Sequence, residues 1–468
     1  MKFVNGGNKV LTLLSLVALL VNYVETMVVP ALPTIQNDFN TTESVIAWVT
    51  SSYIIVGGVS SLLFGKLGDV YGRRKMYLLA MLSYMIAVGI AGFSPNVYFL
   101  IASRAIQGLG MAMFPIGLAI ITDIFPPSKV AFAQGILSST FGIGTALGLI
   151  LGSYIDQILG WQFAFHIAFV LSLILIVLSA RVLGRGEVRR KEVIDYFGIA
   201  TLTIGVTLIL IYITEIPYLG WGSFGEILIL LTGIALIISF VPIEMRSKEP
   251  LISLGLMRIR NFLVANLLGL TSSIALLILF FSVVYYSQLP EPYGLGLDII
   301  SAGLTFAPAT SVMLIVGPIV GNLTPRLGPK PLLITGSIIS MLGFSTFIFN
   351  RSTPFDLSLD AFIVGIGIIS VIIPIVNMVA VSTPQDKRAL SLGVNTLLRN
   401  IGSAIGPVIA STYMTSFKEP YLIYFDGKIL GVVFFPSGLS FNLIFITSII
   451  LMFLTMIIAM FTKNYRFK

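Results

Sequence analysis

The chain has 468 residues, of which 56% are hydrophobic and 10% are charged, with a formal net charge of +8. An average soluble domain has roughly 25% charged residues, so this composition excludes an ordinary soluble protein and favours one embedded in a bilayer. The chain has no cysteine and one histidine, which excludes thiolate metal sites and leaves little for histidine-based catalysis. We therefore expect neither a metal site nor an enzyme active site.

Apolar runs separated by proline and glycine breaks follow one another along the whole chain. About 20 apolar residues cross a hydrocarbon core roughly 30 Å thick. The runs predict fourteen transmembrane helices at about 10–33, 44–64, 75–93, 98–121, 132–154, 163–183, 196–214, 225–243, 262–287, 299–321, 331–349, 359–381, 389–413 and 440–462. The first run continues through Pro33 without a small-residue cleavage site, so we interpret it as an uncleaved helix.

The 28 lysine and arginine residues are concentrated in alternate loops of the predicted topology. Most of them lie in the N-terminus, in every second loop and in the C-terminus, while the intervening loops hold only Arg351, Lys418 and Lys428. Basic residues near helix ends stay on the cytoplasmic side. This pattern predicts a multi-pass protein of the cell membrane with both termini cytoplasmic. The positive charge thus reports topology, and we expect lipid and a small molecule as partners rather than nucleic acid.

The chain also repeats itself. Ten matches occur at two nearly equal offsets: Gly65, Leu67 and Gly72 recur as Gly321, Leu323 and Gly328, and Pro126, Lys129, Ala131, Gly135, Gly144, Gly148 and Ser153 recur as Pro384, Lys387, Ala389, Gly393, Gly402, Gly406 and Ser411. The repeat predicts an all-α integral membrane protein with two six-helix bundles at 1–183 and 261–468, and linkers with an inserted helix pair at 184–260. Parallel repeats place a substrate site at the midplane between rocking halves.

Two motifs carry a resemblance to a known family. Residues 65–75 read GKLGDVYGRRK and are similar to the loop signature between the second and third helices of the major facilitator superfamily. Arg104, Gln107, Gly108 and Gly110 resemble its fourth-helix signature. The chain resembles the fourteen-helix drug:proton antiporter branch, which implies the major facilitator fold, proton-coupled export by alternating access, and a role for Arg104 in proton handling.

The fifth-helix signature of those exporters is altered here. It carries Gly-Pro followed two residues later by Gly-Gly, whereas this chain has Gly148-Leu149 and Gly152-Ser153. This departure leaves open a metabolite importer or uniporter of the same fold. Gly144, Gly148 and Gly152, like Gly402, Gly406 and Pro407 in the second half, are typical of close helix packing.

Glu25 is the one carboxylate deep inside a predicted span. A charge there costs about 2.5–3.5 kcal/mol on insertion scales, so it should face the interior, and intramembrane acids commonly serve proton relays. Arg104 lies at a matching depth on the fourth span and is the expected partner of Glu25 in proton coupling. The alternatives are a Glu25 that only packs helices, and an Arg104 that serves as a hydrogen-bond hub for carbonyl groups.

Further polar residues inside the spans are candidates for the substrate cavity: Asn22, Thr26, Gln107, Asn395 and Arg399. Arg399 could attract an anionic group of a substrate or cap neighbouring carbonyls. The loop motif predicts a cytoplasmic gate formed by Gly65, Asp69, Gly72, Arg73 and Arg74, because an acid there can cap a helix and pair with a neighbouring arginine. The alternative is a basic loop that only sets topology.

No nucleotide-binding loop of the form Gly-x4-Gly-Lys-Ser/Thr occurs, so ATP is not the evident fuel. We expect a monomer without cofactors that uses the proton gradient as its energy source. The favoured function is proton-coupled export of small amphipathic or hydrophobic compounds. A non-transporting membrane sensor is the further alternative.

Overall fold

The computed structural model describes residues 7–183, 196–220, 222–246, 254–384, 388–425 and 428–464. Side chains of a few residues within helices, Asp69 among them, also lie outside the description. Thirteen helices in these ranges are long and apolar enough to cross a membrane. The chain is therefore a multi-pass membrane protein, as the composition predicts.

The helices before residue 184 form what is here called the first half. They are α1 (Gly7–Met27), α2 (Leu32–Asp38), α3 (Glu43–Tyr71), α4 (Arg73–Ala91), α5 (Val97–Gly108), the 3-10 helix η1 (Leu109–Ala112), α6 (Met113–Ile124), α7 (Pro127–Leu159) and α8 (Trp161–Val182). The inserted pair follows as α9 (Tyr196–Leu219) and α10 (Phe224–Arg246), and the short α11 (Leu254–Met257) precedes the second half.

The second half begins at residue 260 and contains the one strand pair of the described residues. Its elements are α12 (Arg260–Gln288), α13 (Ile299–Leu327), α14 (Pro329–Phe349), α15 (Pro354–Ser382), α16 (Arg388–Ser416), β1 (Lys418–Phe425), β2 (Lys428–Pro436) and α17 (Gly438–Met460). The predicted division at 183 and 260 borders segments outside the described residues, so its exact limits stay a prediction.

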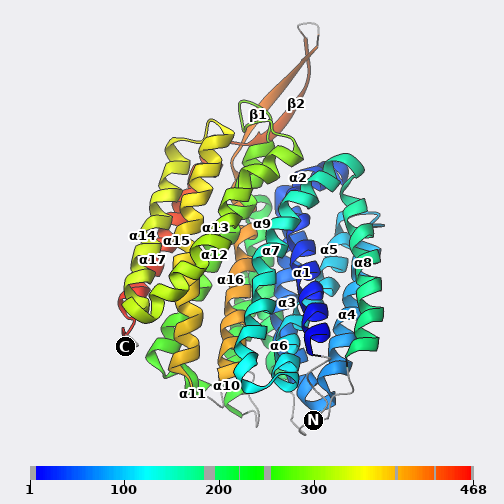
Figure 1. The fold of residues 1–468 in the computed structure, drawn as a ribbon. Helices are drawn as coiled ribbons and strands as arrows, with labels where there is room; N and C mark the ends of the chain where they lie inside the picture. Colours follow the sequence, from blue (N-terminus) through cyan, green and yellow to red (C-terminus); the bar gives the residue numbers. More distant parts are fainter. Residues whose placement is uncertain are drawn as a thin grey trace.

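The long helices of both halves run side by side, with the β1–β2 hairpin projecting from one end of the molecule and the start of α1 and the end of α17 near the other (Figure 1). These ends are called the hairpin end and the termini end below. The two halves meet along two helix pairs, α3 with α16 and α7 with α13. Within each half the corresponding pairs, α1 with α7 and α12 with α16, also pack closely.

Two spans differ from the sequence expectation. The predicted helix at 98–121 is interrupted, since α5 ends at Gly108 and the 3-10 turn η1 precedes α6. A side chain at Gly108 would meet the carbonyl of Tyr53, so the chain passes very close to α3 there. α16 is 29 residues long but is not among the thirteen apolar spans, because Asn395, Arg399 and Asn400 lower its hydropathy. The count of fourteen therefore stays a prediction that depends on α16.

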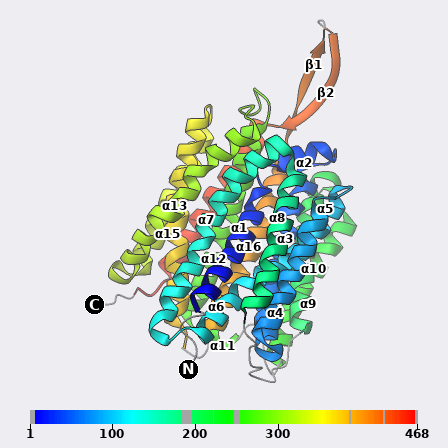
Figure 2. The same ribbon diagram turned by 45° about the vertical axis from the view of Figure 1, so that its right-hand side comes forward.

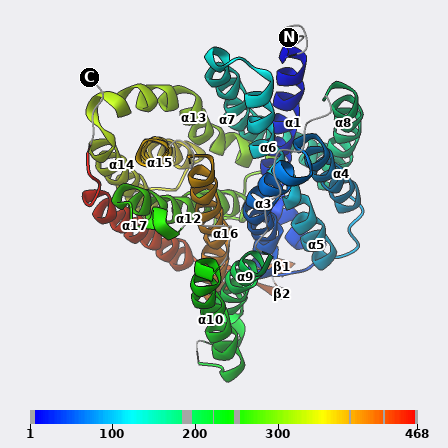
Figure 3. The same cartoon turned by 90° about the horizontal axis from the view of Figure 1, so that it is seen from below.

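The inserted pair lies on the outside of the seam between α3 and α16 (Figure 3). Trp48 on α3 donates its indole N–H to Thr214 Oγ1 on α9 at 3.1 Å. On the other side of the seam, Thr412 on α16 donates to the carbonyl of Ile213 at 3.1 Å. The pair is thus anchored to both halves through α9, while α10 packs on α9.

The strand pair is a feature that the sequence analysis missed. β1 and β2 pair antiparallel from Lys418 opposite Pro436 to Phe425 opposite Lys428, with an irregularity between Ile423 and Tyr424. The hairpin stands well clear of the helices (Figure 2). Its sequence signal was present, because two runs rich in aromatic and branched residues flank an Asp-Gly pair, which is a common hairpin turn.

Candidate functional site

Glu25 lies in the last turn of α1, on the face that also carries Asn22. It is partly exposed and makes no hydrogen bond or ion pair with any residue that the structure describes. Asn22 and Thr26 are buried and satisfied locally: Asn22 Nδ2 donates to the carbonyl of Ala18 at 2.6 Å, and Thr26 Oγ1 donates to that of Asn22 at 3.0 Å. Of these three polar groups, the carboxylate alone remains without a partner.

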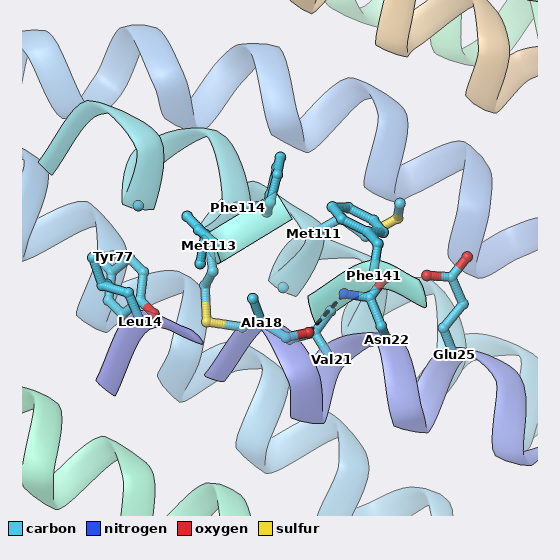
Figure 4. Close-up of a pocket in the computed structure, with 13 residues that line it drawn as sticks. Leu14, Ala18, Val21, Asn22, Glu25, Tyr77, Met111, Met113, Phe114 and Phe141 are labelled. Atoms are coloured by element: carbon cyan, nitrogen blue, oxygen red, sulfur yellow. Dashed lines mark hydrogen bonds between the residues drawn. The ribbon is translucent and has the colours of Figure 1, made fainter. Parts of the chain in front are cut away.

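A cavity of about 30 Å³ lies beside Glu25 (Figure 4). Such a volume holds one or two water molecules. Its lining is mostly apolar and comes from α1, α4, η1, α6 and α7: Leu14, Ala18, Val21, Asn22, Glu25, Tyr77, Gly110, Met111, Met113, Phe114, Gly117, Leu137 and Phe141. A carboxylate next to a small apolar cavity can exchange a proton with a water molecule in that cavity.

Arg104, on α5, is fully buried and contacts both α1 and α3. Its Nε donates to the carbonyl of Val49 at 3.1 Å, and its Nη1 donates to the carbonyl of Val24 at 3.4 Å. The guanidinium carbon also lies 4.4 Å from the ring centroid of Tyr53, and Nη2 has no partner among the described residues. Arg104 thus donates to the main chain of Val24, the residue before Glu25, and forms no ion pair with Glu25 itself. Its bonds to two carbonyl groups have the geometry of a hydrogen-bond hub, which was the alternative interpretation of this residue.

Gln107 lies one helical turn after Arg104 and belongs to the same network. Its Oε1 accepts from Arg104 Nη1 at 2.9 Å, while its buried Nε2 has no partner in the described part of the chain. The structure therefore brings Glu25, Arg104 and Gln107 to one region of the first half. It places Gln107 against Arg104 rather than in the cavity of Figure 4.

The second half has a polar group at α16 and α12. Asn395 Nδ2 donates to Asn266 Oδ1 at 3.2 Å, and Asn395 is 1% exposed. Arg399, one turn later, lies with its stem against Gly269 of α12, where a Cβ would be 2.9 Å from Arg399 Cγ. The side chain makes no hydrogen bond or ion pair with the described residues, and its Nε is buried without a partner. The structure does not show the carbonyl capping that the sequence left open for it.

The predicted gate motif lies at the termini end, where Gly72 joins α3 to α4 with a φ of 96°. Arg73 Nη1 donates to Asp123 Oδ2 on α6 at 2.8 Å, and Arg74 Nη2 donates to the carbonyl of Ala180 on α8 at 2.6 Å. These bonds stay within the first half. Nothing lies within 4 Å of a Cβ at Gly65, and the side chain of Asp69 is outside the description. The role of these residues as a gate stays a prediction.

The glycines of α7 and α16 lie at matching close contacts in the two halves. A Cβ at Gly144 or Gly148 would meet the α1 carbonyls of Leu19 or Tyr23 within about 2.8 Å, and Gly152 faces Met27. In the second half, Gly402 and Gly406 meet the α12 carbonyls of Leu270 and Ile274, while Pro407 lies inside α16. Each pair of helices approaches so closely because no side chain separates the two backbones.

A matched pair of substitutions on α7 tests this close packing. We expect Gly148→Ala to lower the melting temperature by several degrees, since its Cβ would lie 2.5 Å from the Tyr23 carbonyl oxygen and overpacking costs about 1–3 kcal/mol. Gly135→Ala, on the same helix with nothing within 4 Å, should be neutral or stabilising. Thermal unfolding of both purified variants in detergent gives the comparison, and equal melting temperatures would contradict the packing assignment.

At the hairpin end, side chains join the two halves in a way that the sequence did not predict. Lys418 Nζ lies 2.8 Å from Glu43 Oε2, and the hydroxyls of Ser44 and Thr415 are 2.9 Å apart. Beside them, Tyr285 donates to Gln36 Oε1 at 2.7 Å. All of these bonds join α2 or α3 to the second half.

A second bridge at this end links α7 to the start of α13. Gln157 Nε2 donates to Asp298 Oδ2 at 3.0 Å, and the Ile300 N–H donates to Gln157 Oε1 at 2.9 Å. Hydrogen bonds from Ser301, and secondarily from Gln157, lower the pKa of Asp298, so its charged form supports the bridge at neutral pH. The described conformation is closed at the hairpin end. Toward the other end, a cavity of about 540 Å³ lies between α1 and the third and fourth turns of α7.

Several carboxylates are buried near the hairpin end, and the sequence analysis missed two of them, Asp156 and Asp360. Asp156, in the last turn of α7, is 5% exposed, and Asp360, in the second turn of α15, is 4% exposed. Each has one carboxylate oxygen without a partner in the described residues. Both lie at or beyond the predicted ends of their spans, so the sequence suggested solvent contact rather than burial. No group of three or more acidic or histidine side chains with metal-binding geometry occurs among the described residues.

Comparisons with known proteins agree with this arrangement. A family model, "Major Facilitator Superfamily", matches residues 14–407. The chain is 26% identical over 397 residues to the "Tetracenomycin C resistance and export protein" of Streptomyces glaucescens, which covers 84% of this chain and 73% of that protein. It is 27% identical over 393 residues to the "Multidrug export protein EmrB" of Escherichia coli, which covers 82% of this chain and 76% of that protein.

Solved structures resemble the fold over nearly its whole length. A POT family transporter in complex with 5-aminolevulinic acid superposes with a TM-score of 0.69 at 16% identity, covering 97% of this chain and 96% of the other. A bacterial homolog of the human lysosomal transporter Spinster gives 0.63 at 15% identity, covering 98% and 96%. At such identities these two structures support the fold alone, and they confirm the predicted fold class.

Proposed function

Since the chain belongs to the Major Facilitator Superfamily, we propose that it exports small amphipathic or hydrophobic compounds in exchange for protons, by alternating access. It is a membrane transporter rather than an enzyme, and its substrates are small molecules. Export is the activity printed for the tetracenomycin C and EmrB relatives. The proposal carries that activity to this chain, without assigning their substrates.

The observation that carries proton coupling is Glu25. It is a carboxylate inside a spanning helix, without a partner among the described residues, beside a cavity with room for one or two waters. An ionisable group inside the membrane raises the free energy of insertion and is therefore rare, and where one occurs it commonly serves proton or ion transfer. One proton moving through one pH unit and 100 mV supplies about 1.4 and 2.3 kcal/mol. That energy supports a several-hundred-fold solute gradient.

A uniporter or importer is the second candidate, favoured by the altered signature on α7. A Cβ added at Gly303 of α13 would lie 2.6 Å from Ser153 Oγ and 2.8 Å from the carbonyl oxygen of Leu149. The altered residues therefore lie at the contact between the halves near the hairpin end. A change at this contact could alter how the outer side opens, and so whether transport is coupled to protons.

We also propose a monomer in the lipid of the cell membrane, with the proton gradient as energy source and no cofactor. The distribution of basic residues supports placing both termini in the cytoplasm. The chain has no cysteine, so a single introduced cysteine can report the orientation of the protein in the membrane. Lys330 lies at the start of α14, and Pro354 follows the loop after its other end. An impermeant maleimide should label position 354 and spare position 330 in intact cells. The reverse pattern would overturn the orientation.

Reconstitution tests the function itself. Proteoliposomes with an imposed pH gradient are supplied with a panel of fluorescent amphipathic compounds, and uptake is compared with protein-free liposomes. We expect uptake of some panel members that follows the gradient and stops when a protonophore collapses it. Uptake that proceeds equally with and without the gradient would support the uniporter instead.

A further inference from the structure

Arg399, on α16, carries a charge that no described residue compensates. Arg399 makes no hydrogen bond or ion pair with any described residue, and its Nε is buried. Asn395 and Asn266, which also lie at the contact of α16 with α12, bond to each other. The contact with Gly269 holds the stem of Arg399 in place. A guanidinium inside a membrane protein is costly unless something neutralises it, and the described chain offers nothing that does.

The surroundings of α16 indicate where Arg399 points. α16 lies between α12 and α3, with α9 on its outer side (Figure 3). Gly402 and Gly406 face α12, Ala404 accepts from Ser51 of α3, and Thr412 bonds α9. At about 100° per residue, the fourth face, opposite α9, carries Thr396, which is exposed. Arg399 lies on the helix between this interior face and the α12 contact.

The internal repeat supports the same placement. Gly144 and Gly148 of α7 pack on α1 as Gly402 and Gly406 of α16 pack on α12, each pair separated by 258 residues. The same separation relates Arg399 to Phe141. Phe141 lines the cavity beside Glu25 (Figure 4). The second half therefore places a guanidinium where the first half places an aromatic ring against a cavity.

We propose that Arg399 is a subsite for the ionised acidic group of the substrate, so that the transported compounds include amphipathic carboxylates. The planar guanidinium presents its N–H donors in a fork that matches a carboxylate, and such pairs are often bidentate. An incoming carboxylate supplies the missing negative charge, and the apolar body of the compound meets apolar spans. The assignment deepens the proposed export function and rests on it for the direction of transport.

A matched pair of ligands tests the subsite. 2-Naphthoate and 2-naphthamide share shape and apolar area but differ in charge. We expect purified full-length protein in detergent to bind naphthoate more tightly, with Arg399→Gln weakening naphthoate binding roughly 10- to 100-fold, the range for a hydrogen bond to a charged group. Naphthamide binding should change less than about twofold. Arg399→Lys should retain part of the preference, because the charge remains but the fork is lost.

Arg351→Gln is the matched control. Arg351 lies at the hairpin end and is satisfied by Asn442 Oδ1 and by the carbonyls of Phe347 and Gly438. The Arg351→Gln substitution removes the same formal charge as Arg399→Gln and should leave the preference for naphthoate unchanged. Thermal unfolding without ligand separates binding from structure, since removing a partly buried charge that has no partner among the described residues should leave the melting temperature of Arg399→Gln equal or higher.

The outcomes are distinct. A lower melting temperature for Arg399→Gln and Arg399→Met together with an unchanged preference for naphthoate would assign Arg399 a structural role and overturn the subsite. Absence of any preference in the unaltered protein would overturn it as well. If naphthoate binds through Arg399 but no panel compound follows a pH gradient, the export proposal fails while the subsite stands. If transport of both ligands is equal in the unaltered protein and in Arg399→Gln, export stands and the subsite fails.

Discussion

Oxidation of a Ser44→Cys/Thr415→Cys double variant is expected to reduce transport to the level of protein-free liposomes, and a reductant should restore it. The two hydroxyls are 2.9 Å apart and join α3 to α16 at the hairpin end, so sulfurs at these positions lie within reach of a disulfide. A transporter that works by rocking two halves must open this end once in every cycle. A covalent link there stops the cycle. Uptake into proteoliposomes measures the effect.

The control is a disulfide between two helices of the same half. Thr271 on α12 and Thr455 on α17 have hydroxyls 2.7 Å apart, and both belong to the second half. Oxidised Thr271→Cys/Thr455→Cys should transport normally, because these helices move together. The absence of other cysteines makes each cross-link unambiguous. Full transport by the cross-linked Ser44–Thr415 variant would show that the hairpin end does not need to open along this seam.

Glu25→Gln is expected to abolish transport driven by an imposed pH gradient while leaving counterflow between two pools of substrate. Glutamine keeps the shape and hydrogen-bonding capacity of the protonated acid but cannot release a proton. Glu25 has no described ion partner whose charge would be left behind, so the variant should fold. Paired gradient-driven and counterflow assays on the same proteoliposomes separate coupling from binding.

Asp360→Asn serves as the matched control. Asp360 is a buried carboxylate, 4% exposed, but it lies on α15 in the second half rather than on α1 beside the cavity of Figure 4. Its neutral variant should keep gradient-driven transport. Gradient-driven uptake that persists in Glu25→Gln would remove Glu25 from the coupling mechanism, and loss in both variants would indicate that buried acids matter for folding rather than for proton transfer.

Arg104 shows how sequence reasoning reached the right region without the contacts. Matching depth along two spans put Arg104 near Glu25, and the structure places its Nη1 on the carbonyl of Val24, the preceding residue. The rotation of each helix about its axis decides whether an arginine meets a neighbouring carboxylate or a neighbouring main-chain carbonyl. Depth along a helix follows from residue count, but rotation follows from packing against neighbours.

Local sequence was enough to predict the features that the bilayer imposes on each segment separately. A span must be about 20 apolar residues long and must satisfy its own backbone, so the positions of the helices follow from local composition. The repeat also made the close contacts of Gly148 and Gly406 predictable, because small residues at regular spacing report a close neighbour. The hairpin at Lys418–Phe425 and Lys428–Pro436 had a local signal as well.

The contacts that join the two halves, and the polar groups left without a partner among the described residues, could be known only from the folded structure. Gln157 meets Asp298, and Ser44 meets Thr415, across 141 and 371 residues of chain, and no local pattern encodes such pairs. That Glu25 and Arg399 have no partner in the described part of the chain is likewise a property of all their neighbours together. The physical reason is that hydrophobic burial is additive along the chain, whereas a hydrogen bond depends on the relative position of two atoms to within a few tenths of an ångström.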